Sequence, residues 1–67
     1  MSPLELPDDE RRRLRHDLRT PLTIVTGFAE VLAGERPVND ADRRDYAQRI
    51  VEAADEIRDR LDELFGA

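Results

Sequence analysis

Two segments with apolar residues at helical spacing, joined by a short connector, limit this chain of 67 residues to a helical architecture. In the first segment the apolar residues lie three or four positions apart: Leu14, Leu18, Leu22, Val25, Ala29 and Leu32. The second segment has the same spacing: Ala47, Ile50, Ala54, Ile57, Leu61 and Leu64. Such spacing places side chains along one face of a helix, so the sequence predicts an all-α fold.

Capping signals give the expected ends of the first helix. Three consecutive acidic residues begin at Asp8, and negative charge is favoured in the first turn of a helix. Gly34 suits the position just past the C-terminus, because glycine readily adopts positive φ. We therefore expect a helix over residues 8–33, preceded by a flexible lead or linker at residues 1–7.

The second helix is expected over residues 40–65. Asn39 is a good N-cap residue, and acidic residues follow it in the first turn. Residues 34–39 then form the connector. Because two helices of equal length are joined by this short connector, the sequence predicts an antiparallel two-helix hairpin.

The small size of the chain predicts self-association. A domain of 67 residues rarely buries enough apolar surface to be stable alone. The chain contains no cysteine, so no disulfide and no thiolate metal site can replace a core. One hairpin leaves each apolar stripe half uncovered, whereas two hairpins side by side close a core. We therefore expect a homodimer that forms a four-helix bundle.

His16 is the only histidine, and a carboxylate follows it at Asp17. A neutral imidazole can act as a nucleophile or as a base at cellular pH, which makes His16 the candidate reactive residue. Asp17 is the adjacent acceptor that can fix the tautomer of the ring. The alternative is an ordinary solvated histidine in a charge-rich helix.

Pro21 stands slightly more than one turn after the histidine. Inside a helix, proline lacks a backbone N–H and its ring clashes with the carbonyl four residues earlier, here that of Asp17. One alternative is that Thr20 caps a new helix with Pro21 at its first position. The apolar stripe continues through this region without a break, which favours one helix kinked at Pro21.

The residues around His16 also form a family motif. The stretch from His16 to Leu22, HDLRTPL, resembles the H-box of the dimerisation and phosphoacceptor domain of bacterial sensor histidine kinases. Gly27, Glu30 and Leu32 stand where that family often has glycine, glutamate and leucine. The close resemblance ends at Leu32 and is weaker in the second half. It implies a dimeric four-helix bundle that acts in two-component phosphorelay signalling.

The resemblance also implies a role for each residue of the motif. His16 is expected to accept a phosphoryl group and to pass it to an aspartate of a response-regulator receiver domain. Asp17 is expected to accept a hydrogen bond from the other ring nitrogen of His16 and to act as its acid/base partner. Thr20 matches the family position that orients a water for removing phosphate from the receiver. The alternative for Thr20 is a hydrogen bond back to its own helix backbone.

A surface for the receiver is expected on the helix face that carries His16. Thr20, Thr23 and Gly27 follow at helical spacing, and their small side chains let another backbone approach. Arg19 flanks this stripe and joins Thr23 and Gly27 as an expected partner-binding residue. Glycine is unfavourable inside a helix, so a close contact would explain Gly27. The alternative is that Gly27 relieves crowding within the bundle.

Cofactor binding is expected only through partner domains. The chain has three glycines and no phosphate-cradling loop, so we expect it to bind no cofactor alone. ATP and Mg²⁺ are expected from a kinase ATP-binding domain, in cis or in trans, and from the receiver. Whether the chain is itself an enzyme stays open. It could be a piece of a kinase, which is a transferase, or a freestanding dimeric phosphotransfer protein.

Charge and hydropathy argue against nucleic-acid and membrane contact. The net charge is -5, and no apolar run approaches the roughly 18 residues of a membrane span. We expect a cytoplasmic location, either free or as the cytoplasmic part of a membrane-bound sensor. The basic cluster at residues 11–15 is expected to be a solvated face paired with Asp8, Asp9 and Glu10. The alternatives are a nucleic-acid or phospholipid patch and a surface that attracts an acidic partner or phosphate toward His16.

The main competing function is a purely structural dimerisation module without phosphate chemistry. An arginine-led nucleic-acid binder is a weaker competitor. An acid-labile phosphate on His16 distinguishes the phosphoacceptor from the structural module, and salt-dependent affinity for duplex DNA would favour the nucleic-acid binder.

Overall fold

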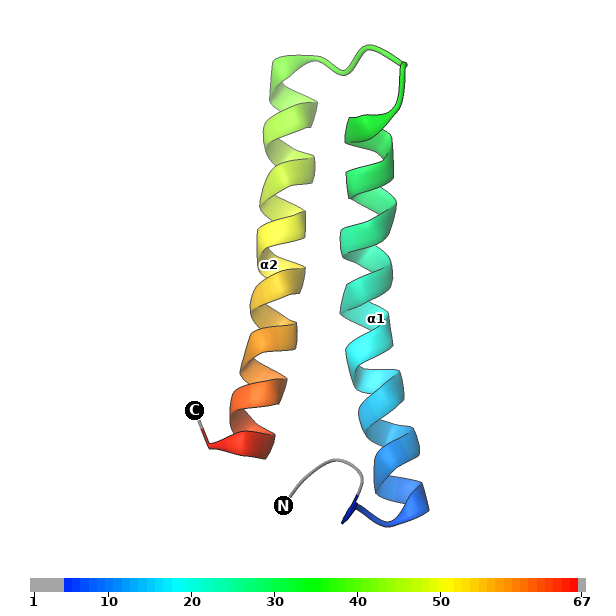
Figure 1. Cartoon of the computed structure of the whole chain (residues 1–67). Coiled ribbons are helices and arrows are strands. Elements are labelled where there is room, and N and C mark those ends of the chain that lie inside the picture. Colours follow the sequence, from blue (N-terminus) through cyan, green and yellow to red (C-terminus); the bar gives the residue numbers. More distant parts are fainter. Residues whose placement is uncertain (1–4, 67) are drawn as a thin grey trace.

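The computed structural model describes residues 5–66, which form an antiparallel helical hairpin (Figure 1). Helix α1 spans Asp8–Ala33 and helix α2 spans Asp40–Phe65, each with 26 residues. The start of α1 and the end of α2 lie at the same end of the hairpin. The expected all-α hairpin is confirmed. The expected lead at residues 1–7 lies partly outside the described residues, which begin at Glu5.

Helix α1 begins without a side-chain cap. Pro7 occupies the N-cap position with extended backbone, and its carbonyl oxygen accepts a hydrogen bond from the Arg11 backbone N–H at 2.9 Å. Asp8 and the two acidic residues after it fill the first turn. Their charge stabilises the backbone N–H groups that have no partner within the helix.

The end of α1 differs from the sequence expectation. Gly34 has φ -73° and ψ 170°, so it is extended and not left-handed, and its N–H donates to the Val31 carbonyl at 3.3 Å. The positive-φ prediction for Gly34 was wrong, because the connector leaves the helix in an extended direction. The left-handed cap occurs instead at Gly66, with φ 63°, whose N–H donates to the Asp62 carbonyl at 2.8 Å.

Asn39 caps the start of α2, as the sequence predicts. Its side-chain oxygen accepts a hydrogen bond from the Asp42 backbone N–H at 2.8 Å, and its side-chain amide donates to the Asp42 carboxylate at 3.1 Å. The Asn39 carbonyl also accepts from the Arg43 N–H at 2.9 Å. These bonds form a reciprocal cap, which fixes the direction in which α2 leaves the connector.

The two helices contact each other along a narrow strip. Only Pro21 and Ala53 are buried among residues 5–66, and Ala53 keeps 4% of its surface exposed. Partly buried apolar residues extend the strip in both directions: Leu14, Leu18, Val25, Phe28 and Leu32 from α1, and Tyr46, Ile50 and Ile57 from α2. Near the connector, the rings of Phe28 and Tyr46 stack with centroids 5.2 Å apart.

The predicted apolar stripe coincides only in part with this strip. Leu22 keeps 53% of its surface exposed and Leu61 keeps 38%, although the spacing predicts both as seam residues. Ala29, Ala47 and Ala54 are also exposed. The physical reason is that each apolar face is wide enough for two neighbouring helices, and the hairpin supplies only one.

Large apolar side chains therefore remain on the surface of one hairpin. They are Leu22, Ile24, Val31, Val51, Leu61, Leu64 and Phe65. No large side chain is fully buried within the part of the chain that the structure describes. Over the same residues, neither helix has a stretch that is long and apolar enough to cross a membrane.

Candidate functional site

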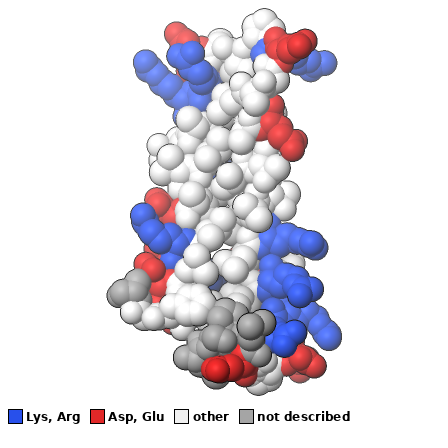
Figure 2. Space-filling model, in the orientation of Figure 1, with Lys and Arg blue, Asp and Glu red and all other residues white. Residues whose placement is uncertain are grey.

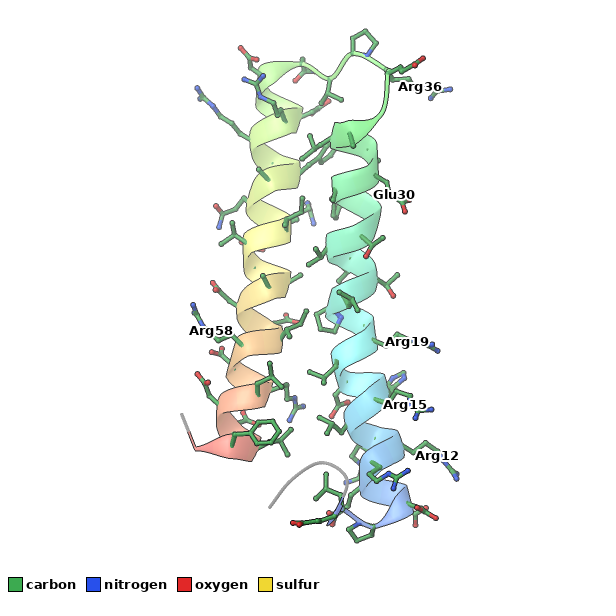
Figure 3. All side chains as sticks on the ribbon, in the orientation of Figure 1. Arg12, Arg15, Arg19, Glu30, Arg36 and Arg58 are labelled. Atoms are coloured by element: carbon green, nitrogen blue, oxygen red, sulfur yellow. The ribbon has the colours of Figure 1, made fainter. Side chains whose placement is uncertain are left out.

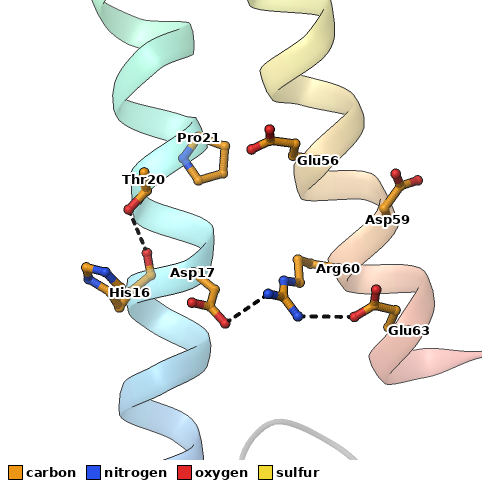
Figure 4. Close-up of a pocket in the computed structure, with 8 residues that line it drawn as sticks. All are labelled: His16, Asp17, Thr20, Pro21, Glu56, Asp59, Arg60 and Glu63. Atoms are coloured by element: carbon orange, nitrogen blue, oxygen red, sulfur yellow. Dashed lines mark hydrogen bonds and ion pairs between the residues drawn. The ribbon is translucent and has the colours of Figure 1, made fainter.

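His16 lies on α1 at the edge of an open groove between the two helices (Figure 4). The groove has a volume of about 450 Å³ and is lined from both helices: His16, Asp17, Thr20 and Pro21 from α1, and Glu56, Asp59, Arg60 and Glu63 from α2. His16 itself is exposed. The structure therefore brings the motif residues of α1 together with four charged residues of α2.

Pro21 holds this part of α1 against α2. It is the one buried residue of α1, and the helix continues through it from Asp8 to Ala33. The alternative in which Thr20 caps a new helix is therefore excluded. Because Pro21 has no N–H, the carbonyl of Asp17 lacks its usual helical donor. The expected bend of the helix at Pro21 stays a prediction.

Thr20 uses its hydroxyl within the helix. Its Oγ1 donates a hydrogen bond to the His16 carbonyl at 3.2 Å, and Thr23 Oγ1 donates in the same way to the Arg19 carbonyl at 2.9 Å. Both bonds span four residues, which is the usual back-bonding of threonine in helices. The Thr20 hydroxyl therefore has a partner in this hairpin, and the water-orienting role stays a prediction.

Asp17 is paired across the groove and not with its neighbour. Its carboxylate lies 3.5 Å from the Arg60 guanidinium, which also contacts the Glu63 carboxylate at 3.2 Å. In Figure 4 the Asp17 carboxylate points toward α2, whereas the His16 ring points away from it. Among the described residues, no hydrogen bond joins Asp17 to the His16 ring. Consecutive residues on a helix point about 100° apart, so the Asp17 rotamer that reaches Arg60 directs the carboxylate away from the His16 ring.

Arg60 is the residue of the site that the motif did not reveal. The register of the hairpin, which sets which residues of α1 and α2 lie level, is what would reveal the Asp17–Arg60 contact. Arg49 lies over the Phe28 ring at 5.8 Å, which fixes which parts of the two helices are level. Asp17 lies 11 residues before Phe28, and Arg60 lies 11 residues after Arg49. Since the helices are antiparallel, equal steps from one contact lead to the other.

The two sides of His16 differ in charge. The groove side has four carboxylates, from Asp17, Glu56, Asp59 and Glu63, and one guanidinium, from Arg60. Within residues 5–66, no group of three or more His, Cys, Asp or Glu side chains is placed to hold a metal ion.

The outer side of α1 is basic. Arg12, Arg15 and Arg19 project outward along it (Figure 3), and Figure 2 shows this column of basic side chains. Over the described residues, the arginines in ion pairs all belong to α2: Arg43, Arg49, Arg58 and Arg60. The expected pairing of residues 11–15 with the acidic first turn was therefore wrong. The arginines extend into solvent instead.

The expected partner-binding residues lie on an exposed part of α1. Arg19, Thr23 and Gly27 line one shallow depression of about 340 Å³ together with Leu22, Thr26 and Glu30. A second depression of about 340 Å³ adjoins it and is mostly apolar, lined by Thr23, Ile24, Gly27, Phe28 and Val31. A Cβ added at Gly27 would meet no atom within 4 Å. Within one hairpin, Gly27 therefore relieves no crowding.

A helical hairpin that exposes a histidine from an HDLRTPL turn defines a histidine phosphoacceptor module. Comparison with protein families matches residues 12–65 to the His Kinase A (phospho-acceptor) domain. The match covers most of the chain, and the chain belongs to this family. The resemblance inferred from the motif is thereby confirmed, and with it a phosphoacceptor role in two-component signal transduction. Comparisons with curated proteins and with solved structures gave no significant match.

The open space at Gly27 gives a prediction about stability. Gly27→Ala should raise the free energy of unfolding by ~0.5 to 1 kcal/mol, because alanine favours the helix and meets no neighbour in the hairpin. Urea unfolding followed by circular dichroism measures the change. A loss of stability would mean that a second chain packs against Gly27, which is the crowding alternative.

Proposed function

We propose that this hairpin acts as a homodimer and carries a phosphoryl group on His16 from a kinase ATP-binding domain to a response-regulator aspartate. The observation that carries the proposal is the exposure of His16 on a continuous helix in a chain of the His Kinase A family. An exposed ring can be reached by two different partner domains in turn. A ring buried in the hairpin could meet neither.

The chemistry is two successive phosphoryl transfers. In the first, a ring nitrogen of His16 bonds to the γ-phosphorus of ATP, and the bond from that phosphorus to the ADP oxygen breaks. The proton on the other ring nitrogen passes to a base. In the second, a receiver carboxylate oxygen bonds to the phosphorus, the phosphorus–nitrogen bond breaks, and the ring regains a proton. Partner domains supply ATP and Mg²⁺, which neutralises charge on the phosphates.

Asp17 is the base that we assign to the first transfer. It is the carboxylate adjacent in sequence to His16, and its side chain is 28% exposed, so it has room to change rotamer. A carboxylate that accepts the ring N–H supports the positive charge that develops during attack. This role requires Asp17 to leave the position in which it contacts Arg60.

Thr20 and the exposed surface beyond it serve the second partner. We assign Thr20 to orienting the water that removes phosphate from the receiver, which requires its hydroxyl to leave the His16 carbonyl. We assign the mostly apolar depression that Thr23 and Gly27 line to receiver docking, with Arg19 nearby on the same helix. The apolar lining around Gly27 supports this assignment, because a docking helix needs apolar surface to bury.

Self-association follows from the incomplete core. Among the described residues the strip between α1 and α2 buries only one residue from each helix, while Leu22, Leu61 and five other large apolar side chains stay exposed. A second hairpin would cover part of this exposed apolar surface, including Leu22, and would leave the depression around Gly27 open. Since ATP and response regulators are cytoplasmic, we place the dimer in the cytoplasm.

If two hairpins associate, the exposed apolar residues should contribute unequally to stability. Leu22→Ala should destabilise the protein by ~2 to 5 kcal/mol for each site, because the partner hairpin buries this side chain. Ile24→Ala is the matched control, since Ile24 is also exposed but lines the depression assigned to receiver docking, and it should change stability by only about 0.5 kcal/mol. Helicity should also fall on dilution. A stable helical monomer in light scattering would contradict the dimer.

The phosphoacceptor assignment predicts the effect of His16→Gln. This variant should keep the helicity and the dimer of the parent chain but take up no phosphate, because no other residue has an imidazole. Intact-mass measurement after incubation with a kinase ATP-binding domain and Mg-ATP tests it.

Asp17→Asn should keep the fold and slow phosphate uptake by ~10² to 10⁴ in the same assay, because the acid/base partner of His16 is lost. Parent protein that stays unphosphorylated would favour the structural module instead.

The docking assignment predicts the effect of Gly27→Arg. A long charged side chain on this exposed surface should block transfer from phosphorylated His16 to a cognate receiver while helicity and dimerisation survive. The loss of phosphate from the hairpin on addition of receiver is the measurement. Transfer at the parental rate would place the receiver elsewhere on the molecule.

A further inference from the structure

The contacts of Arg60 link the two helices beside the reactive histidine. Its guanidinium lies 3.5 Å from Asp17 on α1 and 3.2 Å from Glu63 on its own helix. Of the five ion pairs within residues 5–66, the Asp17–Arg60 pair alone joins α1 to α2. Figure 4 shows the three side chains in one line across the groove, with the His16 ring turned outward.

We propose that Arg60 is a positioning residue that withholds Asp17 from His16 and so restrains phosphorylation of the hairpin. This inference rests on the proposed function, in which Asp17 accepts a proton from the ring. One carboxylate cannot contact Arg60 on α2 and the outward-facing imidazole at once, because the two partners lie on opposite sides of it. The ion pair and the acid/base role therefore exclude each other.

The strength of the pair sets the size of the effect. The side chains of Arg60 and Asp17 are 50% and 28% exposed, so water screens their attraction. A pair of this kind shifts a two-state equilibrium only modestly, by about two- to fivefold. Glu63 competes for the same guanidinium and weakens the hold on Asp17 further. Arg60 is thus a restraint that a small movement of α2 relative to α1 can release.

The test measures phosphorylation of His16 without any partner domain. Phosphoramidate serves as the phosphodonor. A ring nitrogen of His16 bonds to its phosphorus, and the phosphorus–nitrogen bond of phosphoramidate breaks, which releases ammonia. Asp17 takes the proton from the other ring nitrogen. Arg60→Gln should speed this reaction by about two- to fivefold, because Asp17 is released. The same substitution in an Asp17→Asn background should give no acceleration. Acceleration that persists without Asp17, or a rate equal to or below the parental one, would overturn the proposal.

Two further variants separate the restraint from a general loosening of the fold. Arg58→Gln removes a neighbouring arginine whose partner is Asp55, at 3.0 Å, and should leave the rate at the parental value. Arg60→Lys keeps the positive charge but lacks the fork that reaches Asp17 and Glu63 together, so its rate should lie between those of the parent and of Arg60→Gln. Equal acceleration by Arg58→Gln and Arg60→Gln would assign the effect to net charge or to helix stability and would contradict a positioning role for Arg60.

A spectroscopic measurement tests the restraint independently of phosphate chemistry. His16 is the only histidine, so its two ring nitrogens give one unambiguous pair of ¹⁵N signals. Asp17→Asn should shift these signals less in the parent than in the Arg60→Gln variant, where the carboxylate reaches the ring more often. If phosphoramidate labels no variant, the proposed function fails, and these signals still decide the role of Arg60. Signals that do not respond to Asp17 in the Arg60→Gln variant would disprove that role.

Discussion

The narrow contact between α1 and α2 is the constraint on which the rest of this structure depends. Two helices side by side can bury only one edge of an apolar face, and here that edge contains Pro21 and Ala53 at its closest points. Among residues 5–66, large apolar side chains beyond this strip are exposed, and so are the arginines on the outer side of α1. The same incompleteness leaves apolar surface for the proposed second hairpin and leaves His16 exposed.

Pro21 connects packing to chemistry within this strip. A proline inside a helix usually lowers stability, but its ring here supplies the one buried contact from α1. It also deprives the Asp17 carbonyl of a helical donor, in the turn where the proposed mechanism has Asp17 change its contacts. A turn with fewer backbone hydrogen bonds opens at a lower free-energy cost than its neighbours. The motif therefore fixes the position of the turn through burial and loosens its backbone hydrogen bonding.

The sequence predicts the features of this hairpin that local chemistry determines. The amphipathic spacing, the acidic start at Asp8 and the Asn39 cap act within a few residues, so the helices and the phosphoacceptor motif could be recognised. Features that depend on how the two helices meet could not. The apolar spacing does not say which edge faces α2, and the conformation of Gly34 depends on the path of the connector. Arg60 is distant from Asp17 in sequence, so only the hairpin register reveals their contact.

The open site explains why so little catalytic machinery lies on this chain. In the proposed function two different partners reach the same imidazole, so the site cannot be enclosed, and an exposed site stabilises transition-state charge poorly. On that proposal the partners bring the strong electrostatic groups with them, and the hairpin contributes position and timing. A half-exposed ion pair suits timing because its strength is close to thermal energy. A buried pair at Asp17 would hold the carboxylate too firmly for a change in helix packing to release it.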